Sequence, residues 1–273
     1  MFSSRKLLIA SVWVICLAIP AQTWAESKPL PGENADPEAI YPPGERNPNS
    51  GAPAEWPKIT MDQEKFAFAL VDRLEYGDTE GVNNYLWDAQ GWIGGDTNKF
   101  WWKTEGEGPE RGAGPENTEF QALYNRMISP FWGLQAGLRY DTNPGPDRGF
   151  AVLGIQGLAP YWFESDTALF VSDDGKVSFR GEFEYEILLT QRLILQPRLE
   201  FNASAQNVPE YGLGQGLNDT EMGLRLRYEI KREFAPYIGV RYEALYGETE
   251  DIAQRAGEAT SSTNFVIGVR AWY

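Results

Sequence analysis

The ten residues EMGLRLRYEI, at positions 221–230, carry the pattern that decides the fold. In an extended chain, apolar side chains fill one face and glycine or charged side chains fill the other. The apolar set is Met222, Leu224, Leu226, Tyr228 and Ile230, and it opposes Gly223, Arg225, Arg227 and Glu229. This period-two alternation predicts a β-strand with one apolar and one wet face. The same alternation runs through residues 176–189 and 193–203.

Two folds produce this local pattern. A soluble β-sandwich buries its apolar faces, whereas a membrane β-barrel turns them toward lipid. The alternating segments run for about 10 to 14 residues. Strands of soluble proteins usually have about five or six residues, and a tilted membrane strand needs about 9 to 11. Segment length therefore favours the barrel.

The alternation of short and long connections between the predicted strands also favours the barrel. We expect twelve strands, near residues 63–76, 84–94, 98–107, 117–128, 131–142, 149–159, 162–172, 176–189, 192–205, 219–230, 233–247 and 262–273. Short turns alternate with longer links that are mostly rich in Gly, Pro and acidic residues, and 171–176 is the one tight link on the long-loop side. Outer-membrane barrels have short periplasmic turns and longer extracellular loops. The prediction is an all-β, antiparallel transmembrane β-barrel of about 12 strands, with both termini in the periplasm.

Aromatic residues support a membrane location. The C-terminal strand alternates Phe265, Ile267, Val269, Ala271 and Tyr273, and it resembles the recognition signal of outer-membrane assembly. Other aromatic residues fall near strand ends, where they suit interfacial girdles: Trp101, Trp102, Trp132, Tyr161, Trp162, Tyr237 and Trp272.

The N-terminal segment predicts export. Residues 1–25 have a basic start at Arg5 and Lys6, an apolar run over 7–19 and a small-x-Ala cleavage site that ends at Ala25. The alternative is an uncleaved anchor, but the apolar run is shorter than the roughly 20 residues that span a bilayer. Residues 26–60 form a Pro-rich segment, which we expect to be a disordered periplasmic tail. The barrel is expected over 61–273.

Composition excludes several function classes. The chain has no histidine, and its single cysteine, Cys16, lies in the predicted signal peptide. Histidine-dependent hydrolases, three-histidine zinc sites and cysteine chemistry are therefore excluded from the mature chain. We expect no enzymatic activity. The net charge of −15 disfavours nucleic acid and favours cations.

If the apolar faces meet lipid, the opposite faces fill the lumen with charge. The candidate lumen residues are Arg139, Asp141, Glu182, Glu184, Arg198, Glu200, Arg225, Arg227, Glu229, Arg241 and Glu243. Arg opposite Glu on adjacent strands would cross-link and plug a narrow barrel, which is a structural role. The functional alternative is a charged path for a small ion, in which a few carboxylates stay unpaired.

Methionine is the remaining soft metal ligand of the mature chain. Its thioether suits Cu(I), and high affinity usually needs two or three together. The candidates are Met61, Met127 and Met222. Met222 lies on the apolar face of its strand, which predicts packing against lipid. Met127 lies near a strand end, and Met61 follows the tail.

Several long segments resemble the copper resistance protein B family of outer-membrane proteins. The strongest are GLRLRYEIKREFAPYIG at 223–239 and GLAPYWFE at 157–164, supported by LTQRLILQPR at 189–198, GWIGGD at 91–96 and FWGLQAGLRYD at 131–141. The resemblance covers nearly all of 61–273. It implies an outer-membrane barrel that binds copper ions and contributes to copper resistance by export or sequestration. It also implies contact with outer-membrane lipid and with periplasmic copper-handling proteins.

One departure from the family limits what it implies. Members often carry a Met- and His-rich segment before the barrel, and residues 26–57 contain neither amino acid. A copper site would have to use Met61, Met127, Met222 or the lumen carboxylates. The alternative is therefore a narrow charged channel, or a structural barrel, without a specific metal function.

Overall fold

The computed structural model describes residues 64–79, 82–110, 114–143 and 145–273. The predicted signal peptide, the Pro-rich tail and Met61 lie outside the described residues, so these assignments stay predictions.

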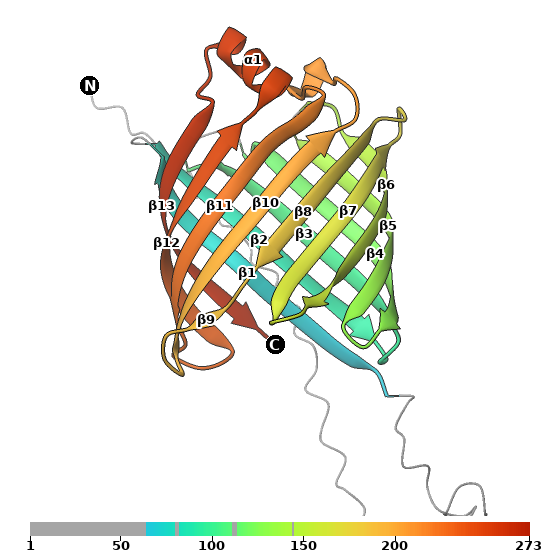
Figure 1. Cartoon of the computed structure of the whole chain (residues 1–273), viewed down its shortest axis with the longest axis vertical. Helices are drawn as coiled ribbons and strands as arrows, with labels where there is room; N and C mark the ends of the chain where they lie inside the picture. Colours follow the sequence, from blue (N-terminus) through green and yellow to red (C-terminus); the bar gives the residue numbers. More distant parts are fainter. Residues whose placement is uncertain (1–63, 80–81, 111–113, 144) are drawn as a thin grey trace, which may run out of the picture. The chain divides into compact units, whose positions relative to one another are not determined.

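Thirteen antiparallel strands form one closed barrel (Figure 1). Consecutive long strands pair with each other, and β13 pairs with β1 to close the wall. This confirms the predicted all-β barrel: twelve strands are long, and β9 has only two residues. The strands are β1 (Phe66–Thr79), β2 (Val82–Gly94), β3 (Asn98–Pro109), β4 (Asn117–Ser129), β5 (Trp132–Asn143), β6 (Arg148–Ala159), β7 (Phe163–Ser172), β8 (Val177–Glu184), β9 (Ile187–Leu188), β10 (Leu193–Ser204), β11 (Gly216–Tyr228), β12 (Phe234–Leu245) and β13 (Ser261–Trp272).

The links divide the barrel into two ends. The end reached by residues 95–97, 130–131, 160–162, 189–192 and 229–233, with the C-terminus, is called the turn end. The opposite end, which carries the longer links 205–215 and 246–260, is called the loop end. One detail of the prediction was wrong. The link 173–176 is not the one tight link at the loop end, because β1 runs to Thr79 and β2 starts at Val82, which leaves two residues between them.

The predicted strand 176–189 is interrupted. It consists of β8 and β9, and Tyr185 and Glu186 separate them. The Tyr185 backbone N–H donates to the carbonyl of Pro197 on β10, but Pro197 has no N–H to donate in return. The ladder therefore breaks at this point. β7 gives no support beyond it, because its pairing with β8 stops at Glu164 opposite Glu184.

The longest loop contains a helix that the sequence pattern did not predict. Helix α1 (Gly247–Ala256) ends at Gly257, which has a positive φ of 80°. Its Thr249 hydroxyl accepts a hydrogen bond from the Gly214 N–H at 2.9 Å, and the Asn218 side chain donates to the same hydroxyl at 2.8 Å. These contacts fix α1 beside the 205–215 loop. In the described part of the chain, no helix has the length and apolar character needed to cross a membrane.

The two faces of the wall are reversed relative to a soluble β-sandwich. Leu138 and Ile267 on the outside are 68% and 61% exposed, whereas Arg73 and Gln135 on the inside are each 1% exposed. A sandwich would bury the leucine and expose the arginine. The apolar face is therefore the one that meets lipid.

A β-bulge in β1 changes which side chains enter the lumen. The ladders to β2 and to β13 both shift register around Asp72. Asp72 and Arg73 are consecutive in sequence, and both are buried on the inside. Since a bulge adds a residue to one strand and re-aims its side chains, this bulge places an extra carboxylate in the lumen.

Candidate functional site

Ion pairs fill the lumen and join strands that are not neighbours in the wall. The pairs among the described residues link nine basic side chains to fifteen carboxylates. Carboxylates are thus in excess in this network. An enclosed space lined by one excess sign of charge attracts ions of the opposite sign. The lumen is therefore suited to cations.

Two buried arginines cross-link one side of the lumen. Arg198 is fully buried and contacts four carboxylates at 2.7–3.1 Å: Glu182, Glu184, Glu200 and Glu221. Arg73 is 1% exposed and contacts Glu221 at 3.2 Å. Since β12 and β13 separate β11 from β1 in the wall, the shared carboxylate of Glu221 ties β10, β11 and β1 together through the interior.

Further pairs extend this network toward both ends. Arg225 donates to Glu75 at 2.6 Å, and the Tyr237 hydroxyl donates to the same carboxylate at 3.1 Å. Arg270 contacts Asp72 at 2.6 Å and Glu186 at 2.9 Å near the turn end. These contacts cross-link β1 and β8–β13, and the space that they leave open borders β8, β10 and β11 as well as β2–β7.

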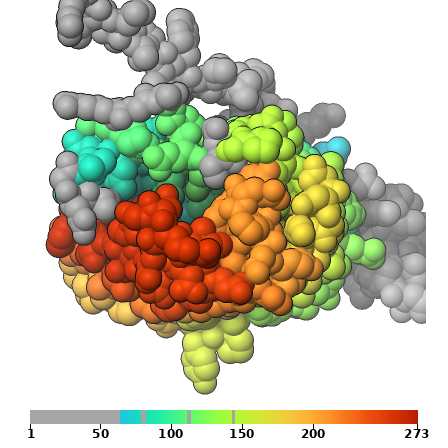
Figure 2. Space-filling view, turned by 90° about the horizontal axis from the view of Figure 1, so that it is seen from above, coloured from blue at the N-terminus to red at the C-terminus, as the bar shows by residue number. Residues whose placement is uncertain are grey.

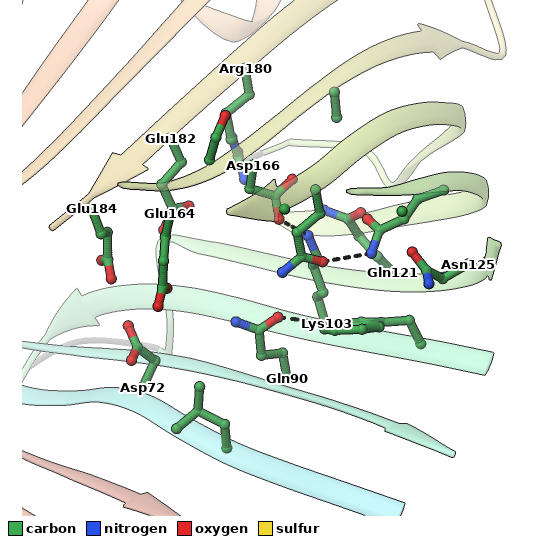
Figure 3. Close-up of a pocket in the computed structure, with 18 of the residues that line it drawn as sticks. Asp72, Gln90, Lys103, Gln121, Asn125, Glu164, Asp166, Arg180, Glu182 and Glu184 are labelled. Atoms are coloured by element: carbon green, nitrogen blue, oxygen red, sulfur yellow. Dashed lines mark hydrogen bonds and ion pairs between the residues drawn. The ribbon is translucent and has the colours of Figure 1, made fainter. Parts of the chain in front are cut away.

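Two cavities occupy that remaining space. The first, which we call the turn-end vestibule, has a volume of about 410 Å³ and reaches the turn residues Pro130 and Phe131. Figure 3 shows its polar lining, in which Asp72, Glu164 and Glu184 point into one part and Gln90, Gln121 and Asn125 lie in another. Lys103 forms an ion pair with Asp166 across it.

The second cavity, the loop-end vestibule, has a volume of about 430 Å³. Asp141, Asp219 and Glu243 line it together with Arg148, whose guanidinium stacks 4.0 Å from the Tyr211 ring. Seen from the loop end, the molecule is hollowed beside the red residues of α1 (Figure 2).

Four residues line both vestibules and therefore form the boundary between them, which we call the waist: Glu105, Glu119, Phe170 and Arg180. Arg180 comes from β8 and contacts Glu105 at 3.2 Å and Glu119 at 3.1 Å. It also approaches Glu200 at 3.5 Å and donates to the Asn202 side chain at 3.1 Å.

An apolar patch forms the opposite wall of the waist. Leu123, Phe150, Val152 and Phe170 make one buried cluster on the inner faces of β4, β6 and β7. Phe170 lies 5.8 Å from the Arg180 guanidinium and 4.7 Å from that of Arg139. The waist is therefore charged on one side and apolar on the other.

The structure places all eleven predicted lumen charges in this ion-pair network: Arg139, Asp141, Glu182, Glu184, Arg198, Glu200, Arg225, Arg227, Glu229, Arg241 and Glu243. Sequence reasoning missed Asp72, Glu119, Glu221 and Arg270. Glu221 lies on the same face of β11 as Arg225, so the alternation of the strand could have identified it as a lumen residue. Asp72 could not, because only the bulge turns it inward.

The two methionines in the described part of the chain, Met127 and Met222, do not come together. Met127 lines the turn-end vestibule, whereas Met222 is 52% exposed on the outer face. Among the described residues, no group of three or more His, Cys, Asp or Glu side chains is arranged to hold a metal ion.

Comparison with known proteins gives consistent matches. The family described as copper resistance protein B precursor (CopB) matches residues 65–273. The chain is 48% identical over 204 residues to copper resistance protein B of Escherichia coli, which covers 75% of this chain and 68% of that protein. It is 39% identical over 207 residues to the copper resistance protein B homolog of Pseudomonas syringae pv. tomato, with 76% and 70% covered. Among solved structures, the NanC porin has a TM-score of 0.51 at 14% identity, covering 73% of this chain and 98% of NanC, which supports the barrel fold alone.

Proposed function

Because this chain belongs to the copper resistance protein B family of outer-membrane β-barrels, we propose that it handles copper ions at the outer membrane and contributes to copper resistance by export or sequestration. The observation that carries the proposal is the 48% identity to a copper resistance protein across the barrel. The carboxylate excess of the lumen supports it, since copper enters or leaves as a cation. Copper here is the cargo.

A complementation assay tests this function. A strain that lacks the gene is compared with the same strain carrying the wild-type gene on medium with increasing copper. We expect the deletion to lower the tolerated copper concentration and the gene to restore it. Unchanged tolerance in the deletion strain would refute a role in resistance. Zinc and nickel serve as controls, because a general leak would alter tolerance to all three metals.

Copper binding by the refolded barrel is a separate test. The wild type is compared with a variant in which Met61, Met127 and Met222 are all changed to leucine. Loss of Cu(I) binding in the variant would assign the function to methionine. Equal binding by both would assign it to the lumen carboxylates, and no binding by either would favour a narrow cation channel without metal preference. The lack of a chelating group among the described residues is the observation that favours this second candidate.

We also assign the turn end to the periplasm and the loop end to the cell exterior, as is usual for bacterial barrels. The mature chain has no cysteine, so single cysteines report orientation cleanly. A membrane-impermeant maleimide added to intact cells should label Gln254→Cys in α1. It should label Arg232→Cys, in the β11–β12 turn, only after the outer membrane is permeabilised. The reverse pattern would overturn the assignment.

A further inference from the structure

The two vestibules meet at the guanidinium of Arg180, the one cation among the four waist residues. Phe170 is 2% exposed and Glu119 is 6% exposed, so packing fixes both, and Glu105, which is 28% exposed, is held by the buried Arg73 at 2.9 Å. Arg180 is 21% exposed and reaches the waist on a long, flexible stem. Its guanidinium lies between the cavity that reaches the turn end and the cavity that opens at the loop end. A change of rotamer at Arg180 would therefore join the two cavities.

The other arginines of the lumen are not equivalent to Arg180. Arg139 and Arg148 line only the loop-end vestibule, and Arg270 lines only the turn-end vestibule. Arg198 and Arg73 have exposed fractions of 0% and 1%, and each contacts three or more carboxylates on different strands. Neither lines both vestibules. They cross-link the wall, whereas Arg180 separates the cavities.

The partners of Arg180 determine what can replace it. Its guanidinium neutralises Glu105, Glu119 and Glu200 at 3.1–3.5 Å. If the side chain swings away alone, the three carboxylates keep one arginine each, Arg73, Arg139 and Arg198, but together they lose one shared positive charge. Losing a cation from a poorly hydrated, carboxylate-rich space is unfavourable. A cation that enters the waist can compensate this charge, and an anion cannot. Displacement of Arg180 is therefore coupled to the arrival of a cation.

We propose that Arg180 is the gate of a cation path through the barrel, and that an incoming inorganic cation takes over its contacts with Glu105, Glu119 and Glu200. The gate keeps the two vestibules separate in the absence of such an ion. Only the identity of the physiological ion as copper rests on the proposed function.

Planar-bilayer conductance of the purified full-length barrel in KCl tests the gate. We expect wild type to show rare, brief openings and Arg180→Ala to show persistent steps. In a tenfold KCl gradient, the reversal potential of the variant should move toward the cation limit of about 59 mV. Arg148→Ala is the matched control, because it removes an arginine that lines only the loop-end vestibule, and it should conduct like wild type.

A second variant guards against misfolding. Glu119→Gln with Arg180→Gln keeps the net charge and the approximate side-chain size, and it should also open the path because the ion pair is lost. Both variants are first shown to be folded by their heat-dependent migration on SDS gels. Equal conductance of wild type and both folded variants, or anion selectivity of Arg180→Ala, would overturn the gate.

The copper proposal can fail separately. If Arg180→Ala opens a cation-selective path but Cu²⁺ neither permeates nor blocks it, the gate stands and copper is not its ion.

Discussion

Replacing Arg198 by methionine should strongly destabilise the barrel. Methionine has a similar volume and retains the packing of the stem, but it carries no charge. Arg198 is fully buried and contacts four carboxylates. Two of these keep other partners, because Glu221 also pairs with Arg73 and Glu200 also pairs with Arg180. Among the ion pairs of the described residues, Glu182 and Glu184 have no second basic partner.

The magnitude follows from those two carboxylates. Removing one side of a buried ion pair costs about 3–5 kcal/mol, because the other charge is left uncompensated. The folded-to-unfolded ratio should therefore fall by about a hundredfold or more. Urea unfolding in lipid vesicles measures this change, and the eight tryptophans of residues 26–273 provide the fluorescence signal. Acidification should narrow the difference in stability between the variant and wild type, because protonation of Glu182 and Glu184 removes the uncompensated charge.

Arg192→Met is the matched control. Arg192 is an exposed residue in the turn before β10, so its replacement should change stability by less than about 0.5 kcal/mol. A loss below about 1 kcal/mol for a correctly folded Arg198→Met variant would show that water solvates Glu182 and Glu184 well enough to make the arginine dispensable. The view of Arg198 as a structural cross-link would then be wrong.

Three further outcomes are expected. Asn218→Ala should make α1 sensitive to limited trypsin digestion at the loop end, because the buried Asn218 amide donates a hydrogen bond to Thr249 of α1. Losing this buried hydrogen bond should lower the local stability by about 1–2 kcal/mol, and unchanged digestion would contradict this. If methionine contributes to copper binding, Met127→Leu should weaken it in an isothermal titration, whereas Met222→Leu on the outer face should not. Trp162→Gly should raise the free energy of unfolding in detergent by about 1 kcal/mol, because Trp162 has a φ of 65° that glycine adopts without strain; a lower free energy of unfolding would show that the contacts of Trp162 outweigh the strain.

The architecture of the wall could be predicted from the sequence because one physical signal dominates it. Alternation assigns each residue of a strand to one face, and it correctly places Met222 outside and Arg225 inside. The signal is strong in β11, where leucine and arginine alternate. It is weak in β6, where Phe150 and Val152 face the lumen and Ala151 and Leu153 face outward. Since both faces of β6 are apolar, the pattern could not reveal the apolar side of the waist.

The alternation of apolar and polar residues could not predict the irregularities of the backbone. At the bulge around Asp72, the face of β1 that points into the lumen changes from even-numbered to odd-numbered residues. The alternation that correctly places Arg73 inside would therefore place Asp72 outside. The break after β8 depends on a proline that lies on the neighbouring strand, twelve residues along the chain from Tyr185. Both features follow from pairing between strands, and a single-strand pattern does not contain that information.

The gate proposed for Arg180 requires that cross-links and an ion path share one lumen, and the exposure of each arginine separates the two roles. An arginine held by carboxylates on several strands and shielded from water has no alternative partner, so moving it would leave buried charge uncompensated on every strand it joins. Arg198 and Arg73 meet this condition. Arg180 makes contacts of similar length, but it borders open volume on both sides and keeps a fifth of its side-chain surface accessible. An ion can therefore reach Glu105, Glu119 and Glu200 before Arg180 moves away from them. A plugged barrel of this kind needs only one accessible arginine to conduct, and the remaining ion pairs can keep the wall rigid while it does.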